Sequence, residues 1–489
     1  MYTYYSETNK LIMKKQNYTL SLMLAGLLIV IGSADLFSQD DNPNLDRIPA
    51  DFLQHQANQT RNPSTVVTID GYDNYYLGVD FAEGHISENP GTPGEYFVAF
   101  NIDDTHYTMD GHDWSNSNVS WGGYYIRGDV LTAYDGDGTL YYENMYGSSI
   151  QGCALVKSTD NGQTWSSPVV AINGYDKNWL AADQTDGPYA NYVYTTMSGG
   201  AGGNFARSTN QGASFSTTFS PSTHNLPGMM VCVGAWGTTD GGAVYVVTNS
   251  GGAFSSTYTF YQSLDGGASF SYKSAQSFAN YVGNNVNGRN SVSNMRTRPY
   301  PFITADNSDG SYRGRLYLVY ASNDPVGNGN KPDIFCRYSD DGGATWSSDV
   351  TVNDDFPSNT NNQWHPATWC DYETGRLYVQ WMDTRDTPSA DSALIYGSYS
   401  DDGGQTFVQN HAISNVKMKI NCTTCGGGGT PRYEGDYNGI VSNLVTSMAT
   451  WSDFRNGNFA TYTGYFPDYA LFVSPASAPA INNIASFDA

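Results

Sequence analysis

The chain has 489 residues, with 52 glycines, 38 tyrosines and only 14% charged residues. Its formal net charge of −24 excludes the basic surface that nucleic acids and polybasic membrane contacts require. This acidity is typical of a protein kept in solution by its charge, and carboxylate-rich turns leave a structural calcium ion as an alternative. We therefore expect no nucleic-acid partner, no required cofactor and no metal site in the chemistry.

Residues 13–38 have the pattern of a signal peptide. Met13-Lys14-Lys15 gives a positive start, and Leu20–Ile31 is an apolar run that is short for a membrane span. Small residues follow, and we expect cleavage between Ser38 and Gln39. The pattern predicts an exported protein, secreted or held at the cell surface, without a membrane span once residues 1–38 are removed.

Residues 65–467 repeat one structural unit, and two irregular segments flank them. The polar residues 39–64 are expected to form a lead-in segment, and residues 468–489 a tail or linker. In each unit a strand runs into an Asp, a turn follows, and a second strand carries Tyr, as in Leu131–Asp135 followed by Leu140-Tyr141. A third strand then leads into an eight-residue motif.

This motif has the pattern Ser-x-Asp/Asn-x-Gly-x-Ser/Thr-Trp/Phe. The Asp or Asn caps backbone N–H groups of a tight turn, and the Gly supplies a positive φ. The aromatic residue opens a fourth strand and is expected to pack against its own blade or the next one. Five copies predict a repeat of four short antiparallel strands. The copies are Ser158–Trp165, Ser208–Phe215, Ser263–Phe270, Ser339–Trp346 and Ser400–Phe407.

Two further units lack a full motif. A degenerate copy at Tyr107–Trp114 keeps Gly111 and Trp114 and indicates a first unit from about residue 84 to 118. The last unit runs through Ile440 and Trp451 to Tyr465 and lacks a fourth strand, which Thr65–Ile69 could supply. Such a closure would join the first and last units and remove exposed sheet edges.

The six cysteines divide into two groups. Cys422-Thr423-Thr424-Cys425 precedes four glycines and is interpreted as a small disulfide loop, with a redox pair or half of a zinc site as alternatives. The others lie in strand-like runs, which is typical of buried free thiols. They are Cys153, Cys232, Cys336 and Cys370.

Residues that directly precede the inner strands of a propeller surround one end of its central channel. In this chain the positions are rich in ionisable and aromatic residues, so we predict a ligand site there, with salt bridges between blades as the alternative. Arg385 and Arg455 are expected to pair locally with Asp383 and Asp453 instead. The predicted ring contains Glu83, His85, Arg127, Asp129, Asp176, Lys177, Trp179, Arg296, Arg298, His365, Arg432, Glu434, Asp436 and Tyr437.

The repeated motif resembles the Asp box, or BNR repeat, of the sialidase-like (neuraminidase) β-propellers. The resemblance covers about residues 84–467 and implies an all-β propeller of four-stranded antiparallel blades. It also implies that the Asp-box turns lie at the periphery, away from the substrate site. The repeats of this chain add up to seven blades, whereas sialidases have six, so six remains the alternative.

The resemblance also implies roles at the channel. Sialidases bind the carboxylate of sialic acid with three arginines, and they use a Tyr–Glu nucleophile pair and an Asp acid. By position, Arg127, Arg298 and Arg432 are the candidate triad. Glu434 with Tyr437 or Tyr433 is the candidate nucleophile pair, and Asp129 is the candidate acid. Further candidate substrate-binding residues are Asp176, Lys177, Trp179 and His365.

Two functions fit this pattern. The first is a secreted exo-glycosidase, of the exo-α-sialidase type if it is an enzyme, working by two-step covalent catalysis. The alternative is a non-catalytic carbohydrate-binding or adhesion propeller at a bacterial cell surface. One fold carries many functions, so the convergence of three arginines with a Tyr–Glu pair would separate the two. In both cases we expect a monomer whose partner is a glycan or glycoconjugate.

Overall fold

A computed structural model describes residues 64–466, apart from 70–71, 253, 278–280, 325–330, 356–360, 388–390, 421–429, 444–445, 456 and 458–459. These residues belong to the second of two compact units of the chain, Leu45–Ala489. The predicted signal peptide, the lead-in up to residue 63, the tail and the Cys422–Cys425 loop lie outside the described residues. Among the residues described, no helix is long and apolar enough to cross a membrane.

Antiparallel strands form all of the regular structure in the described residues, which confirms the predicted all-β propeller. The first sheet contains β3 (Ala82–Glu88), β4 (Tyr96–Asn101), β5 (Asp104–Thr108) and β6 (Trp114–Asn116). The second contains β7 (Ile126–Tyr134), β8 (Leu140–Tyr146), β9 (Gly152–Ser158) and β10 (Val169–Asn173). The third contains β11 (Trp179–Ala182), β12 (Val193–Gly199), β13 (Gly202–Ser208) and β14 (Ser216–Phe219).

The following sheets repeat this order. The fourth contains β15 (Met230–Trp236), β16 (Thr239–Gly252), β17 (Ser255–Ser263) and β18 (Ser271–Gln276). The fifth contains β22 (Phe302–Ala305), β23 (Leu316–Ser322), β24 (Asp333–Ser339) and β25 (Val350–Thr351). The sixth contains β26 (Gln363–Cys370), β27 (Leu377–Asp383), β28 (Ser392–Ser400) and β29 (His411–Ala412), and β30 (Met418–Lys419) also pairs with β28. A small extra sheet contains β19 (Asn284–Val286), β20 (Arg289–Val292) and β21 (Met295–Arg296).

The seventh large sheet combines both ends of the described chain. It contains β31 (Gly439–Asn443), β32 (Thr446–Asp453) and β33 (Ala460–Tyr465), followed by β2 (Tyr72–Gly78) and β1 (Thr65–Ile69). The sequence predicted Thr65–Ile69 as its fourth strand, but the fourth strand is β2 and Thr65–Ile69 is the fifth. The reason is burial: Tyr75 and Leu77 of β2 are fully buried, whereas β1 is mostly exposed and forms an edge.

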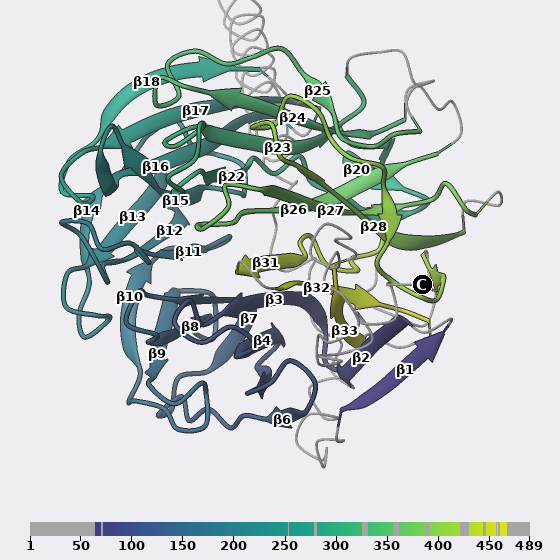
Figure 1. The fold of residues 1–489 in the computed structure, drawn as a ribbon, viewed down its shortest axis with the longest axis horizontal. Coiled ribbons are helices and arrows are strands. Elements are labelled where there is room, and N and C mark those ends of the chain that lie inside the picture. The colour runs from purple at the N-terminus through teal and green to yellow at the C-terminus, as the bar shows by residue number, and fades with distance from the viewer. Residues whose placement is uncertain are drawn as a thin grey trace, which may run out of the picture. The chain divides into compact units, whose positions relative to one another are not determined.

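The first strands of these sheets form a ring. In the described residues, β3 contacts β7 and the contacts continue through β11, β15, β22, β26 and β31 back to β3. Figure 1 shows inner strands such as β11, β26 and β31 near the centre and outer strands such as β1, β6, β14 and β18 at the edge. The arrangement places the starts of all the inner strands around one axis.

The five Asp boxes join the third and fourth strands of sheets two to six, and they form the predicted turns. At Ser339–Trp346, the Ser339 hydroxyl donates to Asp341 (2.8 Å) and accepts from the Gly343 N–H (2.9 Å). Asp341 also accepts from the Thr345 N–H (2.8 Å), and Gly343 has φ +88°. Burial acts to raise the pKa of Asp341, but the hydrogen bonds from Thr345 and Ser339 outweigh it and lower the pKa.

The degenerate copy in the first sheet is a box that is one residue shorter. The Thr108 hydroxyl accepts from the Gly111 N–H (3.0 Å), and Asp110 accepts from the Asp113 N–H (2.9 Å). Thr108 and Asp110 therefore replace the Ser and Asp of the motif. The sequence pattern missed both because it assumed a fixed spacing.

The Asp-box aromatic residues contact the preceding blade, which the prediction did not include, and Trp165 also contacts Tyr142 of its own blade (6.0 Å), as predicted. The Trp346 ring lies 4.5 Å from the Phe260 ring of the fourth sheet, and the Trp165 ring lies 5.3 Å from Phe97 of the first. Both tryptophans are half-buried. The Asp boxes thus connect neighbouring sheets.

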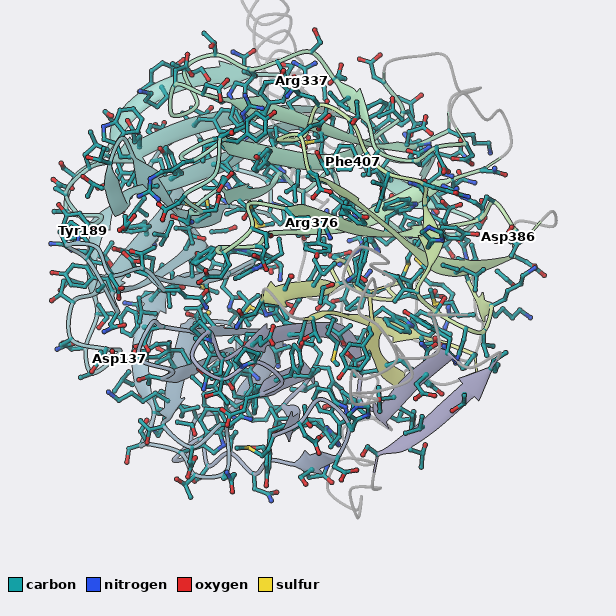
Figure 2. The ribbon with its side chains drawn as sticks, viewed as in Figure 1. Asp137, Tyr189, Arg337, Arg376, Asp386 and Phe407 are labelled. Atoms are coloured by element: carbon teal, nitrogen blue, oxygen red, sulfur yellow. The ribbon has the colours of Figure 1, made fainter. Side chains whose placement is uncertain are left out.

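The Asp boxes and the turns after the inner strands lie at the same ends of the sheets, because antiparallel strands alternate in direction. Gln211 of the second box donates to Asp137, in the turn after β7 (2.9 Å). Figure 2 shows Asp137, Tyr189 and Arg376 of these turns together with Phe407 of the last box. The starts of the inner strands lie at the opposite ends.

Two local expectations are confirmed. Arg385 pairs with Asp383 (2.9 Å), and Arg455 pairs with Asp453 (2.6 Å). The four cysteines in the described part of the chain are buried free thiols: Cys153, Cys232, Cys336 and Cys370.

Candidate functional site

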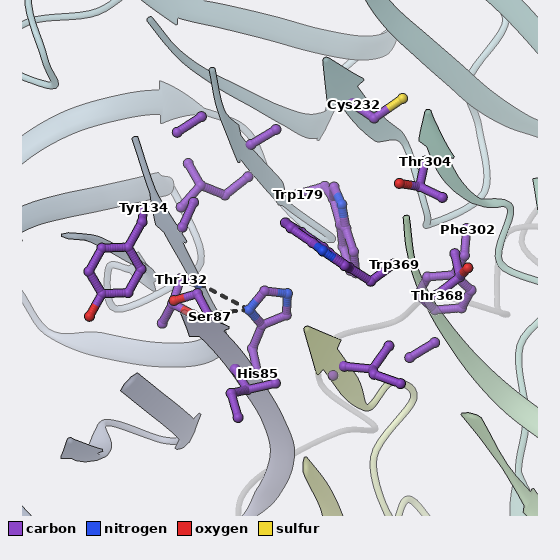
Figure 3. A pocket seen from close by; sticks show the side chains of 18 of the residues that line it. His85, Ser87, Thr132, Tyr134, Trp179, Cys232, Phe302, Thr304, Thr368 and Trp369 are labelled. Atoms are coloured by element: carbon purple, nitrogen blue, oxygen red, sulfur yellow. Dashed lines mark hydrogen bonds between the residues drawn. The ribbon is translucent and has the colours of Figure 1, made fainter. Parts of the chain in front are cut away.

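The inner strands surround a cavity of about 90 Å³, which we call the axial cavity. Alternate residues of a strand point to opposite faces, so each inner strand presents only one or two side chains to the axis. The lining includes small polar side chains such as Ser87 and Thr132, aromatic ones such as Trp179 and Phe302 (Figure 3), and aliphatic ones such as Val231.

A group of buried charged and aromatic residues lies at the starts of the inner strands, and we call it the axial cluster. Ion pairs, ring contacts and mutual electrostatic effects connect its members. They are Glu83, Asp129, Lys177, Arg296, Arg298, His365, Tyr433, Asp436 and Tyr437.

Glu83 is buried, and its backbone and carboxyl group form hydrogen bonds with three other segments of the chain. It has φ +64°, and its N–H donates to the Ser452 hydroxyl (2.8 Å). Its Oε1 accepts from the Asp436 N–H (2.8 Å) and its Oε2 accepts from the Asn101 amide. Burial and the negative charge of Asp129 raise the pKa of Glu83 well above its usual value, although Lys177 and a hydrogen bond from Tyr433 oppose the shift.

Asp436 has the opposite character. Arg296 approaches it with two nitrogens, Nε at 3.2 Å and Nη2 at 2.5 Å, and the Arg298 Nε lies 3.7 Å away. Burial acts to raise the pKa of Asp436, but the two arginines outweigh it and lower the pKa to about 2. The Arg296 guanidinium also lies over the Tyr433 ring, 4.2 Å from its centroid.

Lys177 and Asp129 lie at the starts of neighbouring inner strands. Asp129 has φ +53° in an irregular part of β7, and its carboxylate is 4.0 Å from the Lys177 ammonium. The ammonium lies 3.4 Å from the centroid of the Tyr437 ring and 5.7 Å from that of Trp179. Lys177 is 2% exposed, and its Nζ has no hydrogen-bond partner among the described residues.

Two histidines border this group. His365 is buried and has φ +49°. Burial lowers its pKa to about 4; the charge of Asp436 opposes this shift, and the charges of Arg296 and Arg298 add to it. The His85 Nδ1 accepts from the Thr132 N–H (3.2 Å). Burial and the charge of Lys177 lower the pKa of His85 to about 3. Both rings are therefore neutral near pH 7.

The structure gives the predicted arginine triad three different surroundings. Arg298 faces Asp436, whereas Arg127 is half-buried with its guanidinium 5.7 Å from the Tyr125 ring centroid. Arg432 is half-buried, and its backbone pairs with Met295 beside β21. The described contacts thus connect Arg298 with Arg296, a residue that the triad did not include.

The two tyrosines of the predicted Tyr–Glu pair have these described contacts: the Tyr437 hydroxyl donates to the Val130 carbonyl (2.9 Å), and Tyr433 hydrogen-bonds to Glu83. Glu434 is buried, and the adjacent Gly435 lies against Glu83. Of the remaining candidates, Asp176 and Trp179 are half-buried, and Trp179 lines the axial cavity.

Sequence reasoning missed a second buried carboxyl, Glu143. It accepts from the Asn178 amide (3.0 Å) and the Thr195 hydroxyl (2.9 Å), and burial raises its pKa to about 7. Asn178 follows Lys177, so Glu143 supports the segment that carries the ammonium. The available signal was a glutamate in the middle of the tyrosine-rich strand-like run Leu140–Tyr146.

No cluster of three or more metal-binding side chains occurs in the described residues. The structure therefore offers no described site for the calcium ion that the sequence left open.

Comparison with known proteins gives one family match and several fold matches. A family model described as "BNR/Asp-box repeat" matches residues 337–348. A search of curated proteins finds no match to this chain.

The solved structures to which the chain is similar include three at low identity. A protein of unknown function from Dyadobacter fermentans is 13% identical, with a TM-score of 0.41 over 70% of this chain and 95% of its own. A GH74 enzyme of Niastella koreensis is 15% identical, with a TM-score of 0.44 over 83% of this chain and 62% of its own. A GH74 xyloglucanase from Xanthomonas campestris is 15% identical, with a TM-score of 0.45 over 79% of this chain and 54% of its own. The resemblance to Asp-box propellers that the five repeats predict is thus confirmed: the chain is a β-propeller with BNR/Asp-box repeats.

Proposed function

We propose that this protein is a secreted glycan-acting propeller, and that it hydrolyses glycosidic bonds at the axial cluster. The observation that carries the proposal is that Glu83 and Asp129 lie at the starts of the neighbouring inner strands β3 and β7, where the charge of Asp129 raises the pKa of Glu83. Glycosidases use two carboxyl groups in different environments, one as proton donor and one as base or nucleophile.

Glu83 fits the role of the proton donor. Its pKa is raised by burial and by Asp129, so the carboxyl group holds its proton at a pH where ordinary carboxylates have lost theirs. In this role Glu83 gives a proton to the glycosidic oxygen as the bond to the leaving sugar breaks. Asp129 takes a proton from the attacking water, and Lys177, 4.0 Å from Asp129, supplies a positive charge beside it.

An exo-α-sialidase reaction is a second form of this proposal, in which Glu83 is the base beside a tyrosine nucleophile and not the proton donor. The hydrogen bond between Tyr433 and Glu83, next to Arg296, favours it because a tyrosine nucleophile needs a neighbouring base. In the sialidase form, Arg298 is the member of the predicted triad that would contact the carboxylate of the substrate. Asp436 already faces Arg296 and Arg298, which favours a neutral sugar instead.

The alternative is a carbohydrate-binding propeller without catalysis. The observation in its favour is the burial of the acids, because Glu83 is 1% exposed and a substrate must reach it. A ligand held at the axis would then be bound without being cut.

One experiment separates these functions. The purified protein is incubated with fluorogenic glycosides, including neutral pyranosides, neutral furanosides and a sialoside, between pH 4 and 8. The variants are Glu83→Gln and Asp129→Asn, and Asp309→Asn is the matched control, because Asp309 is a fully exposed carboxylate. We expect release of the fluorophore by the native protein and Asp309→Asn, and a loss of at least about a hundredfold in the other two variants.

Equal hydrolysis by all four proteins would refute the axial cluster as the catalytic site. Binding of the glycosides without release would establish the non-catalytic alternative. Cleavage restricted to the sialoside would select the sialidase form.

A further inference from the structure

We propose that the axial cavity is a subsite for one neutral, hydroxyl-bearing sugar ring. The inference rests on the proposed function and adds the substrate class, because it assigns the cavity to an uncharged sugar and not to an acidic one. It is carried by two lining residues with unpartnered polar atoms, by the absence of arginine and lysine from the described lining, and by aromatic rings.

Two polar groups of the lining have no partner for their hydrogen bonds. The Ser87 hydroxyl and the Asn438 Oδ1 are buried and have no hydrogen-bond partner in the described chain. The Asn438 amide nitrogen faces the His365 carbonyl at 3.5 Å, which fixes Oδ1 as the free acceptor. A buried polar atom without a partner is costly, so a site of this kind is built for water or for a polar ligand.

His85 supplies a donor to the same cavity. Its Nδ1 accepts from the Thr132 N–H at 3.2 Å and lies 3.1 Å from the Thr132 hydroxyl, so the proton of the neutral ring is on Nε2. Figure 3 shows the His85 ring between Thr132 and Trp179. The cavity thus offers a donor (His85), an acceptor (Asn438) and a hydroxyl (Ser87), which together match the hydroxyl groups of a sugar.

The described lining of the cavity includes no cationic side chain that an acidic sugar could pair with. It contains neither arginine nor lysine, and its ionisable groups are His85, Glu88, cysteine and tyrosine. Burial, with help from Lys177, lowers the pKa of His85 to about 3, and burial raises the pKa of Glu88 well above its usual value. An acidic sugar would lose its hydration there without gaining a cation, so the cavity selects against it.

Aromatic rings complete the site. Trp179 stands edge-to-face with His85 (5.7 Å) and Phe302 (5.6 Å), and the Trp369 ring is stacked on Tyr372 (5.7 Å). Such rings cover the apolar C–H faces of sugars. A cavity of about 90 Å³ holds several water-sized groups at ~10–15 Å³ each, which suits one ring and excludes an oligosaccharide. Trp179 also adjoins Lys177, so a ring in the cavity lies next to the axial cluster.

The test is equilibrium binding of monosaccharides, followed by tryptophan fluorescence and calorimetry. The probes are L-arabinose, D-xylose, D-galactose and D-glucose, with glucuronic acid and sialic acid as charged counterparts. We expect at least one neutral sugar to bind at least tenfold more tightly than either acid.

Two variants place the binding in the cavity. Ser87→Ala removes a hydroxyl that has no protein partner, so we expect about three- to tenfold weaker binding with an unchanged or higher melting temperature. Ala181→Leu fills part of the cavity and is expected to abolish binding. Thr218→Ala, on the outer strand β14, is the control and should bind as the native protein does.

Preference for an acidic sugar, or full binding by Ser87→Ala, would overturn the subsite. Because binding is measured without turnover, its result is independent of hydrolysis. Neutral-sugar binding without any glycosidase activity would support the subsite and refute the proposed enzyme. Hydrolysis that is unaffected by Ser87→Ala and Ala181→Leu would support the proposed enzyme and refute the subsite.

Discussion

The exchange Asp436→Asn tests the charge arrangement of the axial cluster. Asp436 is 4% exposed and lies against Arg296 and Arg298. The amide of asparagine keeps the size of the side chain but removes its charge from beside two buried guanidinium groups. Loss of one partner from a buried ion pair costs about 3–5 kcal/mol, and since an amide oxygen still accepts a hydrogen bond, we expect about 2–4 kcal/mol at pH 7.

The pKa of Asp436 gives a second estimate of the same quantity. The folded protein holds the pKa at about 2, against an ordinary value of 3.8. A shift of this size corresponds to about 2 kcal/mol of stability. Because the folded-state pKa is lowered, this stability is complete well above pH 4 and is lost as the pH falls through about 2.

The assay is urea unfolding of the native protein and of Asp436→Asn, followed by tryptophan fluorescence between pH 7 and pH 3. We expect the full difference in free energy of unfolding at pH 5–7 and about half of it at pH 3. Asp309→Asn, at an exposed position, is the control and should follow the native protein. A difference below about 1 kcal/mol at pH 7, or one that stays constant down to pH 3, would refute the ion-pair argument.

Two further predictions concern the Asp box and the axial histidine. Trp346→Ala should lower the free energy of unfolding by about 2–3 kcal/mol in thermal denaturation, less than for a core tryptophan, because the ring is half-buried against Phe260. A loss of 4 kcal/mol or more would mean that the ring is a core side chain. The imidazole of His85 should show no NMR titration between pH 5 and 8, since its pKa is lowered to about 3. Its lowered folded-state pKa also means that stability is lost as the pH falls below 6.5, and a midpoint near 6.5 in the folded protein would contradict the burial of the ring.

The Asp boxes could be predicted from sequence because each one is complete within eight residues. Ser339, Asp341, Gly343 and Thr345 make their bonds to one another, so the pattern of letters already contains the contacts. The first sheet shows the limit of this reasoning. There Thr108 and Asp110 make the same bonds with one residue fewer, which a fixed spacing does not find.

The axial cluster could be located from sequence, but its contacts could not. Residues that precede inner strands meet at the axis of any propeller, which was enough to place Glu83, Lys177 and Asp436. The pairing of carboxyl groups with cations depends on how distant segments are positioned. One contact that positions them is the hydrogen bond from the Asp436 N–H to Glu83, which spans 353 positions of the chain. Such contacts exist only once the ring is closed, so the sequence alone could not show that Arg298 lies beside Asp436 together with Arg296.

The closure of the ring by β2 and β33 has a consequence for how the molecule is made. Tyr75 and Tyr76 pair with Thr463 and Tyr462, so β2 must wait for a partner strand that is synthesised several hundred residues later. Strand pairings between distant segments form slowly, because a long loop must close, at a cost in chain entropy, before the stabilising contacts can form. Until residues 460–465 have left the ribosome, β2 lacks its partner, and the chain is an open row of sheets with an unpaired edge at each end. We therefore expect the loss of either β2 or β33 to destabilise the folded protein, since each strand is the other's partner in the sheet that closes the ring.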